Sequence, residues 1–498
     1  MDFLEQFPPM GCVRLGDLKF LANFDQISSS SQVFVLFVLE NRTMPQRTLR
    51  RPIQNLRSPG ASLIRDTDVG AVIGFFTLVV VGMWWHHGGM IGFGNSIVTK
   101  MTALDQITGL LCSEAGLLGL ILVTRTPLLE RKYGLDRLLN WHRLLGVAMS
   151  LLLILHIVFS VWAWSTPGGV FNAVKSFTGG ESYMALTAVG TLIILLVTLS
   201  SLKWFRNQLS YEMWYFVHLT VYVGLAMSFS HQIVLGSDFA TDKLARWFWV
   251  GLHVVIILWI IWSRWGSLAR ASMRPLTVAS VTHEAQGVTS VVLQGSHLKQ
   301  HRAQAGQFYL LRQVVRGRWW QANPFSLSSV PTTAGLRFTI KARGEASEAM
   351  TNIRVGTKVI AEGPYGVCTP DAVGDKKALL VAGGVGIGPI VSYLEHLQPS
   401  SEPIVLYRAH SSKEVTHLEE IEALVKARNG RVHTLIGPRA KLKVADPFAP
   451  KVLLKLIPDL ASRVVMVAGP ESMVKAVQRG SKAAGVPSEN IHAERAWW

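Results

Sequence analysis

Six apolar segments, all in the first half of the chain, constrain its fold more than any other feature. They lie near residues 69–85, 104–123, 144–164, 184–202, 212–235 and 245–263 of a chain of 498 residues. Each approaches the roughly 20 residues that a helix needs to cross the hydrocarbon core of a bilayer. The sequence therefore predicts an all-α bundle of six membrane-spanning helices over residues 66–265, preceded by an N-terminal cytoplasmic extension, residues 1–65.

The basic residues predict how these spans are oriented. Lys and Arg concentrate in segments 42–65, 125–143, 203–206 and 264–274, whereas the opposite loops hold only Lys100, Lys175, Lys243 and Arg246. The positive-inside rule then places both termini in the cytoplasm, with the spans in the cell (plasma) membrane. Much of the net charge of +17 is this topology signal, so no nucleic-acid partner is expected. Met44 opens one basic stretch and is a candidate natural start.

Four histidines occupy two of the spans. His142 and His156 are 14 residues apart, and His218 and His231 are 13 apart. These intervals correspond to roughly 21 and 20 Å along a helix, which suits two metal centres near opposite faces of the membrane. Imidazoles from two sides fill both axial positions of a haem iron. The hypothesis is an inner centre at His142 and His218 and an outer one at His156 and His231; the alternative is four isolated structural histidines.

The azimuth of the rings tests this hypothesis. Fourteen residues at about 100° each return to within about 40° of the same helix face, but thirteen leave the second ring about 140° away. The two-centre hypothesis therefore predicts an irregularity in the fifth span, for which a wide π-type turn is the candidate. A regular helix with its two rings on opposite faces would contradict it.

The second half of the chain has another character. Residues 278–281, 289–293, 307–312, 336–341 and 358–361 are short stretches rich in β-branched or aromatic residues, typical of the strands of an antiparallel barrel or sandwich over residues 274–372. From residue 376 to 498, strands alternate with helical patterns, which predicts a parallel α/β sheet. We therefore expect a multidomain protein: a helical bundle, an antiparallel β-barrel and a parallel α/β domain.

Two motifs in the predicted barrel suit a flat ring with a phosphorylated tail. Residues 323–329 form a proline-fixed turn that presents an aromatic ring and three hydroxyls. Residues 341–347 end a strand and open a helical stretch, where backbone amides and Gly344 suit a pyrophosphate, with Lys341 or Arg343 adding charge.

Three motifs in the last domain suit a dinucleotide. The loop 383–389 lies between a strand and a helix, where glycines allow a phosphate to approach the helix N-terminus. Arg408 with Ser411 or Ser412 suits a 2′-phosphate, which favours NADPH over NADH; a solvated strand end is the alternative. Residues 468–470 close a later strand, and Trp498 is a candidate to stack on a flavin.

Together these motifs resemble the ferric reductase/NADPH oxidase family, and in particular bacterial NADPH oxidase-like chains. The resemblance covers the chain from about residue 69 and rests on residues 141–146 with the four histidines and on the cytoplasmic motifs above. It implies a di-haem b membrane domain fused to a ferredoxin–NADP reductase-type dehydrogenase. The implied FAD contacts are Pro324, Phe325, Ser326 and Ser329, with Gly344 and Ser347 at its pyrophosphate; the implied nucleotide contacts are Gly383, Gly384, Gly386, Gly469 and Pro470.

Three positions depart from the family pattern. Asn323 stands where His is frequent, Ala468 where Cys is frequent, and Gly388 where Thr or Ser is frequent. Each departure puts a single contact in doubt, but the predicted sites are kept.

The expected function is an oxidoreductase that carries electrons from cytoplasmic NADPH through FAD and two b-type haems to an acceptor at the outer face. The outer loops hold few basic residues, which favours O2, giving superoxide, over a ferric chelate. Ferric-chelate reduction and electron donation to a periplasmic protein stay open as alternatives. No protein partner is evident.

Overall fold

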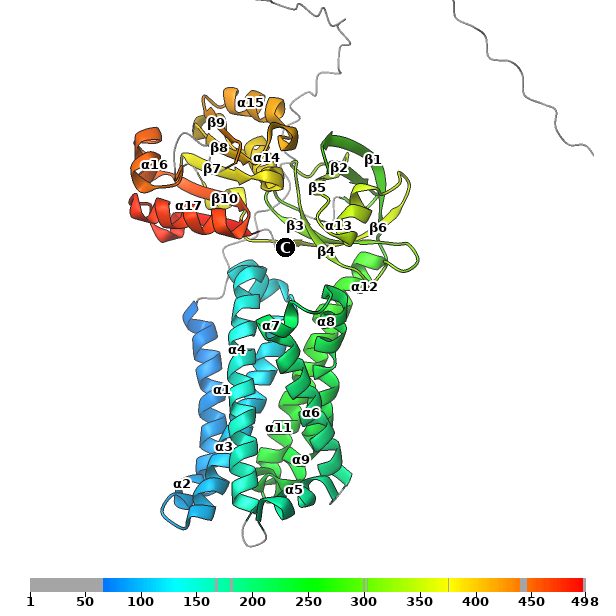
Figure 1. Ribbon diagram of the computed structural model, residues 1–498, viewed down its shortest axis with the longest axis vertical. Helices are drawn as coiled ribbons and strands as arrows, with labels where there is room; N and C mark the ends of the chain where they lie inside the picture. Colours follow the sequence, from blue (N-terminus) through cyan, green and yellow to red (C-terminus); the bar gives the residue numbers. More distant parts are fainter. Residues whose placement is uncertain are drawn as a thin grey trace, which may run out of the picture. The chain divides into compact units, whose positions relative to one another are not determined.

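A computed structural model describes residues 66–165, 169–179, 182–298, 301, 303–374, 376–438 and 446–495 (Figure 1). The expectations about residues 1–65 and about Trp498 lie outside the described residues.

The six predicted spans are confirmed as helices long and apolar enough to cross a membrane. They are α1 (Asp66–His86), α3 (Ile97–Leu122), α4 (Pro127–Trp164), α6 (Ser182–Ser201), α8 (Tyr211–Leu219) with α9 (Val221–Leu235), and α11 (Lys243–Ile260), which continues through a π-helical segment (Ile261–Trp265) into α12 (Gly266–Ser272). The short helices α2 (Gly89–Gly92), α5 (Gly169–Gly179), α7 (Lys203–Arg206) and α10 (Ser237–Ala240) connect them.

The third span begins earlier than its apolar run predicts. Helix α4 contains a break at Gly134, whose φ of 74° is left-handed, and the apolar stretch runs from Arg137 to Trp164. His142 therefore lies well inside a helix instead of at its edge. An argument based on hydropathy missed this turn of helix because the residues before position 144 are polar.

After α12 the chain forms a six-stranded antiparallel sheet in the order β4-β3-β6-β1-β2-β5. Its strands are β1 (Leu276–Ala285), β2 (Val288–Gln294), β3 (Phe308–Gln313), β4 (Asn323–Ser326), β5 (Leu336–Lys341) and β6 (Lys358–Tyr365), with helix α13 (Glu345–Thr351) between the last two. A bridge from Leu327, just past β4, to Phe338 in β5 draws the two edge strands together. Alternate side chains of these strands form one buried core.

The last unit is a five-stranded parallel sheet in the order β11-β10-β7-β8-β9. Its elements are β7 (Ala378–Gly383), α14 (Ile387–His396), β8 (Ile404–Ala409), α15 (Leu418–Lys426), β9 (Arg431–Ile436), α16 (Pro450–Leu456), β10 (Val464–Gly469), α17 (Glu471–Ala483) and β11 (Ile491–Arg495). Helices α14 and α15 cover one face and α16 and α17 the other (Figure 1). Both faces are buried, which is why β7 and β10 are apolar throughout.

Candidate functional site

Two pairs of histidines face each other inside the helical bundle. His142 on α4 and His218 on α8 have ring centroids 6.0 Å apart. His156 on α4 and His231 on α9 have ring centroids 6.2 Å apart. The structure therefore brings together the same two pairs that the sequence spacing predicts.

These separations suit a metal ion held between two imidazoles. Metal–imidazole bonds of about 2 Å, with each ring centroid about 1 Å beyond its nitrogen, put two opposed rings about 6 Å apart. Aromatic rings in direct contact also lie about 4.5–7 Å apart, so the chemistry of the side chains carries the argument together with the distance. Two imidazoles from different helices are a donor set that a haem iron takes, so the residues present fit two haems.

Hydrogen bonds to Nδ1 fix the orientation of the rings in the first pair. Nδ1 of His142 donates to the carbonyl oxygen of Gly119 over 3.0 Å. Nδ1 of His218 lies 3.3 Å from the hydroxyl oxygen of Ser201. Because Nδ1 is occupied, Nε2 is the nitrogen left to bind a metal.

The second pair has a different support. Nδ1 of His156 lies 2.9 Å from the backbone carbonyl of Asp105 and 2.8 Å from its carboxylate. The sequence argument missed Asp105, although an acidic residue at the start of an apolar span is itself a signal of function. A carboxylate bonded to a ligating imidazole makes the imidazole a stronger electron donor, so the two pairs are electronically distinct.

Glycines make room for the rings and for close helix contact. A Cβ at Gly109 would lie 2.9 Å from the His156 ring, so only glycine fits beside that ring on α3. A Cβ at Gly190 on α6 would lie 2.7 Å from the carbonyl oxygen of Gly224 on α9. These contacts let α3 approach α4 closely and let α6 approach α9 closely.

The fifth span is irregular between its two histidines, as the two-centre hypothesis requires. Helix α8 ends at Leu219 and α9 begins at Val221, and the Thr220 N–H donates to the Val217 carbonyl over 3.1 Å. This three-residue spacing winds the backbone more tightly than an α-helix. The predicted π-type turn is therefore wrong. The backbone is overwound at this point instead, which brings thirteen residues nearer to four full turns. The π-helical segment occurs instead in the sixth span.

The predicted flavin motif lies on β4, a strand that the sequence argument read as a turn. Pro324, Phe325 and Ser326 pair with β3, and Ser329 follows just beyond the strand. The Ser326 hydroxyl donates to the carboxylate of Glu494 on β11. Glu494 belongs to the penultimate stretch of the chain, and no sequence signal pointed to it. The parallel sheet thus delivers a carboxylate to the flavin motif of the antiparallel sheet.

Lys341 and Ser347, in the second motif of the antiparallel sheet, already bond to other groups of the protein. Nζ of Lys341 lies 3.0 Å from the Glu414 carboxylate. The Ser347 hydroxyl accepts hydrogen bonds from the N–H groups of Arg343 and Gly344 at 2.9 and 3.0 Å, which caps α13. Lys341 and Ser347 therefore reach a phosphate only by exchanging these partners.

The glycine loop and the later motif lie side by side at the carboxyl ends of neighbouring strands. A Cβ at Gly386 would lie 2.3 Å from the carbonyl oxygen of Ala468, and one at Gly383 would lie 2.9 Å from Pro470. Gly384 has a left-handed φ of 54° and Gly469 one of 151°. The backbones could not approach this closely with any other residue. Ligands of open parallel sheets bind at this edge.

Arg408 and Ser411 follow β8 at the same edge. Arg408 pairs in register with Gly383, which puts the two residues on adjacent strands. Its guanidinium donates to the carbonyl oxygen of Leu435 over 2.9 Å and to that of Ala409. Ser411 precedes a short turn at Ser412–Glu414. The structure thus gathers the glycine loop, Arg408, Gly469 and Pro470 at one edge.

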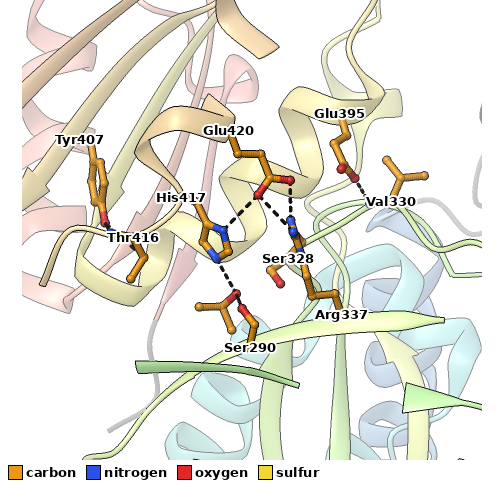
Figure 2. Close-up of polar contacts among 10 residues, drawn as sticks. Ser290, Ser328, Val330, Arg337, Glu395, Tyr407, Thr416, His417 and Glu420 are labelled. Carbon is orange, nitrogen blue, oxygen red and sulfur yellow. Dashed lines mark hydrogen bonds and ion pairs between the residues drawn. The ribbon is translucent and has the colours of Figure 1, made fainter. Parts of the chain in front are cut away.

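A buried polar network joins the two sheets (Figure 2). Arg337 on β5 contacts both carboxylate oxygens of Glu420 on α15, at 2.9 and 3.1 Å. His417 donates from Nδ1 to Glu420 over 3.1 Å, and its Nε2 lies 2.9 Å from the Thr339 hydroxyl. Burial raises the pKa of Glu420, but the His417 hydrogen bond and the Arg337 charge outweigh it and bring the pKa down to about 2. The carboxylate therefore stays ionised and holds the sheets together.

Comparison with known proteins agrees with this architecture. Residues 108–229 match the family model described as ferric reductase like transmembrane component, and residues 380–479 match the oxidoreductase NAD-binding domain. The first of these matches contains His142, His156 and His218, and the second contains the glycine loop and Arg408.

Three curated relatives are similar over part of the chain. Flavohemoprotein A of Dictyostelium discoideum is 26% identical over 34% of this chain and 45% of its own length. The ferredoxin reductase component of 3-ketosteroid-9-alpha-monooxygenase of Mycolicibacterium smegmatis is 28% identical over 44% and 64%, and a flavohemoprotein of Xylella fastidiosa is 24% identical over 47% and 59%. The chain thus spans about half to two thirds of the length of these relatives.

A solved structure, the ferredoxin reductase in carbazole 1,9a-dioxygenase, is 19% identical over 45% of this chain and 68% of its own, with a TM-score of 0.39. One part of the chain therefore matches a ferric reductase like transmembrane component and another matches an oxidoreductase NAD-binding domain, and the described residues contain six helices long and apolar enough to cross a membrane.

Proposed function

We propose that the protein oxidises cytoplasmic NADPH and passes the electrons singly across the membrane to O2 at the outer face. When bound, FAD would split the electron pair of a hydride, and two b-type haems would relay single electrons between the faces of the membrane. One NADPH then reduces two O2 to two superoxide ions and releases one proton. The observation that carries the proposal is the pair of ring separations, 6.0 and 6.2 Å, in one chain with a reductase unit.

The residues of the bundle hold and separate the two centres in this proposal. His142 and His218 would hold the inner haem, and His156 and His231 would hold the outer one. Gly119 and Asp105 keep the ring orientations through their bonds to Nδ1.

The cytoplasmic residues bind and orient the donor. In the proposal, residues 324–329 and Gly344 with Ser347 hold FAD, and Gly383, Gly384 and Gly386 hold the nucleotide at the edge of the parallel sheet. Arg408 and Ser411 recognise the 2′-phosphate of NADPH, and Gly469 and Pro470 lie beside the nicotinamide. Ser326 and Glu494 form a hydrogen-bonded pair among the residues that would hold FAD, and the carboxylate can accept a proton there. Trp498 is proposed to cover the flavin.

Ferric-chelate reduction is the second candidate, favoured by the family that residues 108–229 match. One experiment separates the two. Full-length protein is purified in detergent and supplemented with FAD and haem, and NADPH oxidation is followed with O2 and with a ferric chelate separately. Superoxide dismutase-sensitive reporter reduction in O2, with no anaerobic reduction of the chelate, supports the proposal. Anaerobic chelate reduction without superoxide in air would replace it with ferric reduction.

The same preparation tests the haems. A dithionite-reduced minus oxidised spectrum is expected to show b-type bands that correspond to two haems per chain. Protein that carries flavin and oxidises NADPH but shows no such bands would contradict the proposed path.

A further inference from the structure

The segment between β3 and β4, Val314–Gln321, combines exposed apolar and basic side chains. Trp319 is 63% exposed, Val314 45% and Val315 38%. Arg316 is also exposed. The segment contains two arginines and no acidic residue. Exposed tryptophan beside arginine is the composition of protein surfaces at a membrane interface, where the indole occupies the headgroup level.

This loop has a defined backbone conformation, with a hydrogen bond at each of its two turns. The Arg318 N–H donates to the Val315 carbonyl over 3.2 Å, and the Gln321 N–H donates to the Arg318 carbonyl over 3.0 Å. Gly317 has a left-handed φ of 83°, which the third position of a type II turn requires. Arg316 and Gly317 therefore form the tip of a defined turn.

One aromatic contact joins the loop to a membrane span. The ring of Trp320 lies 5.2 Å from that of Phe216 on α8, centroid to centroid. Phe216 is five residues into the span that begins at Tyr211, or about 7.5 Å along the helix axis. The interfacial layer on each side of the hydrocarbon core is about 5 to 8 Å thick. Trp320 thus packs against the first turns of a candidate span, close to one of its ends.

Other contacts between the antiparallel sheet and the spans agree with this placement. The Gly366 N–H, just past β6, donates to the Glu130 carboxylate on α4 over 2.7 Å. Nη1 of Arg125, before α4, lies 3.5 Å from the buried carboxylate of Glu362 on β6. The sheet is therefore held against the ends of the spans at points other than the loop.

We propose that Val314–Trp320 is a membrane-seated loop that inserts Trp319 into the bilayer interface and binds anionic phospholipid headgroups through Arg316 and Arg318. The Arg318 guanidinium has a weak exposed contact with Glu345 at 3.6 Å, which a headgroup phosphate can replace. Two residues, Gln321 and Ala322, separate the loop from β4. The lipid surface thereby helps to set the position of the flavin motif next to the membrane domain.

The test measures where the loop lies, so it needs neither NADPH nor haem nor an electron acceptor. Cys12, Cys112 and Cys368 are replaced, and a nitroxide is attached to Trp319→Cys in the full-length protein in lipid nanodiscs. The matched control is Leu454→Cys on α16, which is likewise exposed and apolar, at 39%. Collision of each nitroxide with O2 and with a water-soluble nickel chelate is measured by power saturation.

The nitroxide at position 319 is expected to collide with O2 more than with nickel, with an O2-to-nickel ratio severalfold above that at position 454. Equal ratios at the two positions would overturn the proposal. Low collision with both reagents at position 319 would also overturn it, because it would mean that a protein surface covers the loop.

Lipid composition tests the arginines. The ratio at position 319 is expected to rise when phosphatidylglycerol is added to phosphatidylcholine nanodiscs, and Arg316→Gln with Arg318→Gln is expected to abolish the rise. A ratio that is identical in both lipids would refute anionic headgroup binding. Because Cys112 is buried, each variant is compared with the cysteine-free parent protein, and haem and flavin content equal to that of the parent shows that the variant is folded.

Discussion

Replacing Glu420 with glutamine should loosen the contact between the antiparallel and the parallel sheet. Glutamine keeps the size of the side chain but removes the charge that Arg337 and His417 share (Figure 2). The Arg337 side chain is only 10% exposed. Its guanidinium would keep its bonds to the Ser328 carbonyl and lose its counter-ion in a largely buried place.

The pKa of Glu420 gives the magnitude. It falls from 4.5 to about 2 on folding, and at about 1.4 kcal/mol for each pH unit this corresponds to about 3 kcal/mol. The carboxylate is 26% exposed, so solvent screening lowers the expected value to about 2–3 kcal/mol. Because the pKa is depressed, this stabilisation is complete above pH 4.5 and is lost as the pH falls towards 2.

Hydrogen exchange of peptides from α15 and β5 measures this effect in the full-length protein. At about 1.4 kcal/mol per factor of ten, E420Q should exchange roughly 30- to 150-fold faster than wild type at pH 7. At pH 3, where an opened form is already protonated, the ratio should shrink to about tenfold or less.

Glu419→Gln is the matched control, because Glu419 is the exposed neighbour on the same helix and should leave exchange unchanged. Equal exchange in E419Q and E420Q, or a difference that does not shrink at low pH, would refute the reasoning.

Three further predictions concern the electron path. His231→Ala should halve the b-type haem per chain in reduced-minus-oxidised spectra, because His142 and His218 still face each other; complete loss in a folded protein would contradict two separate centres. Asp105→Asn should raise the midpoint potential of the outer haem in a redox titration by on the order of tens of millivolts, since the carboxylate stabilises the oxidised imidazole-bound iron; a fall would reverse that account. Glu494→Gln should slow flavin reduction by NADPH about tenfold or more at unchanged FAD content, as measured by stopped flow, and an unchanged rate would remove Glu494 from the site.

The histidine pairs show how far sequence spacing reaches. Spacing along a helix fixes axial separation, so the pairing of His142 with His218 and of His156 with His231 was predictable. It does not fix azimuth once the helix departs from regular geometry, as it does at the tight turn at Thr220. The direction of the irregularity was therefore predicted wrongly.

The candidate site in the second half of the chain divides in a similar way into residues that sequence reasoning found and residues that it missed. The glycine loop was visible because a strand–glycine–helix pattern is local. Glu494 was not visible in this way, because it is 168 residues from Ser326 along the chain. It reaches Ser326 only after β11 joins the parallel sheet beside β10. Arg337 on β5 and Glu420 on α15 likewise meet only because the two units pack together.

By itself the sequence determined the six spans, the order of the two sheets and the residues able to bind a metal, because run length, side-chain alternation and ligand chemistry are properties of short segments. Only the tertiary structure decided which groups support them: Asp105 behind His156, Glu494 beside Ser326, and Trp320 against Phe216. Each of these contacts joins segments far apart in the chain, and their partners are chosen by packing, which no local pattern encodes.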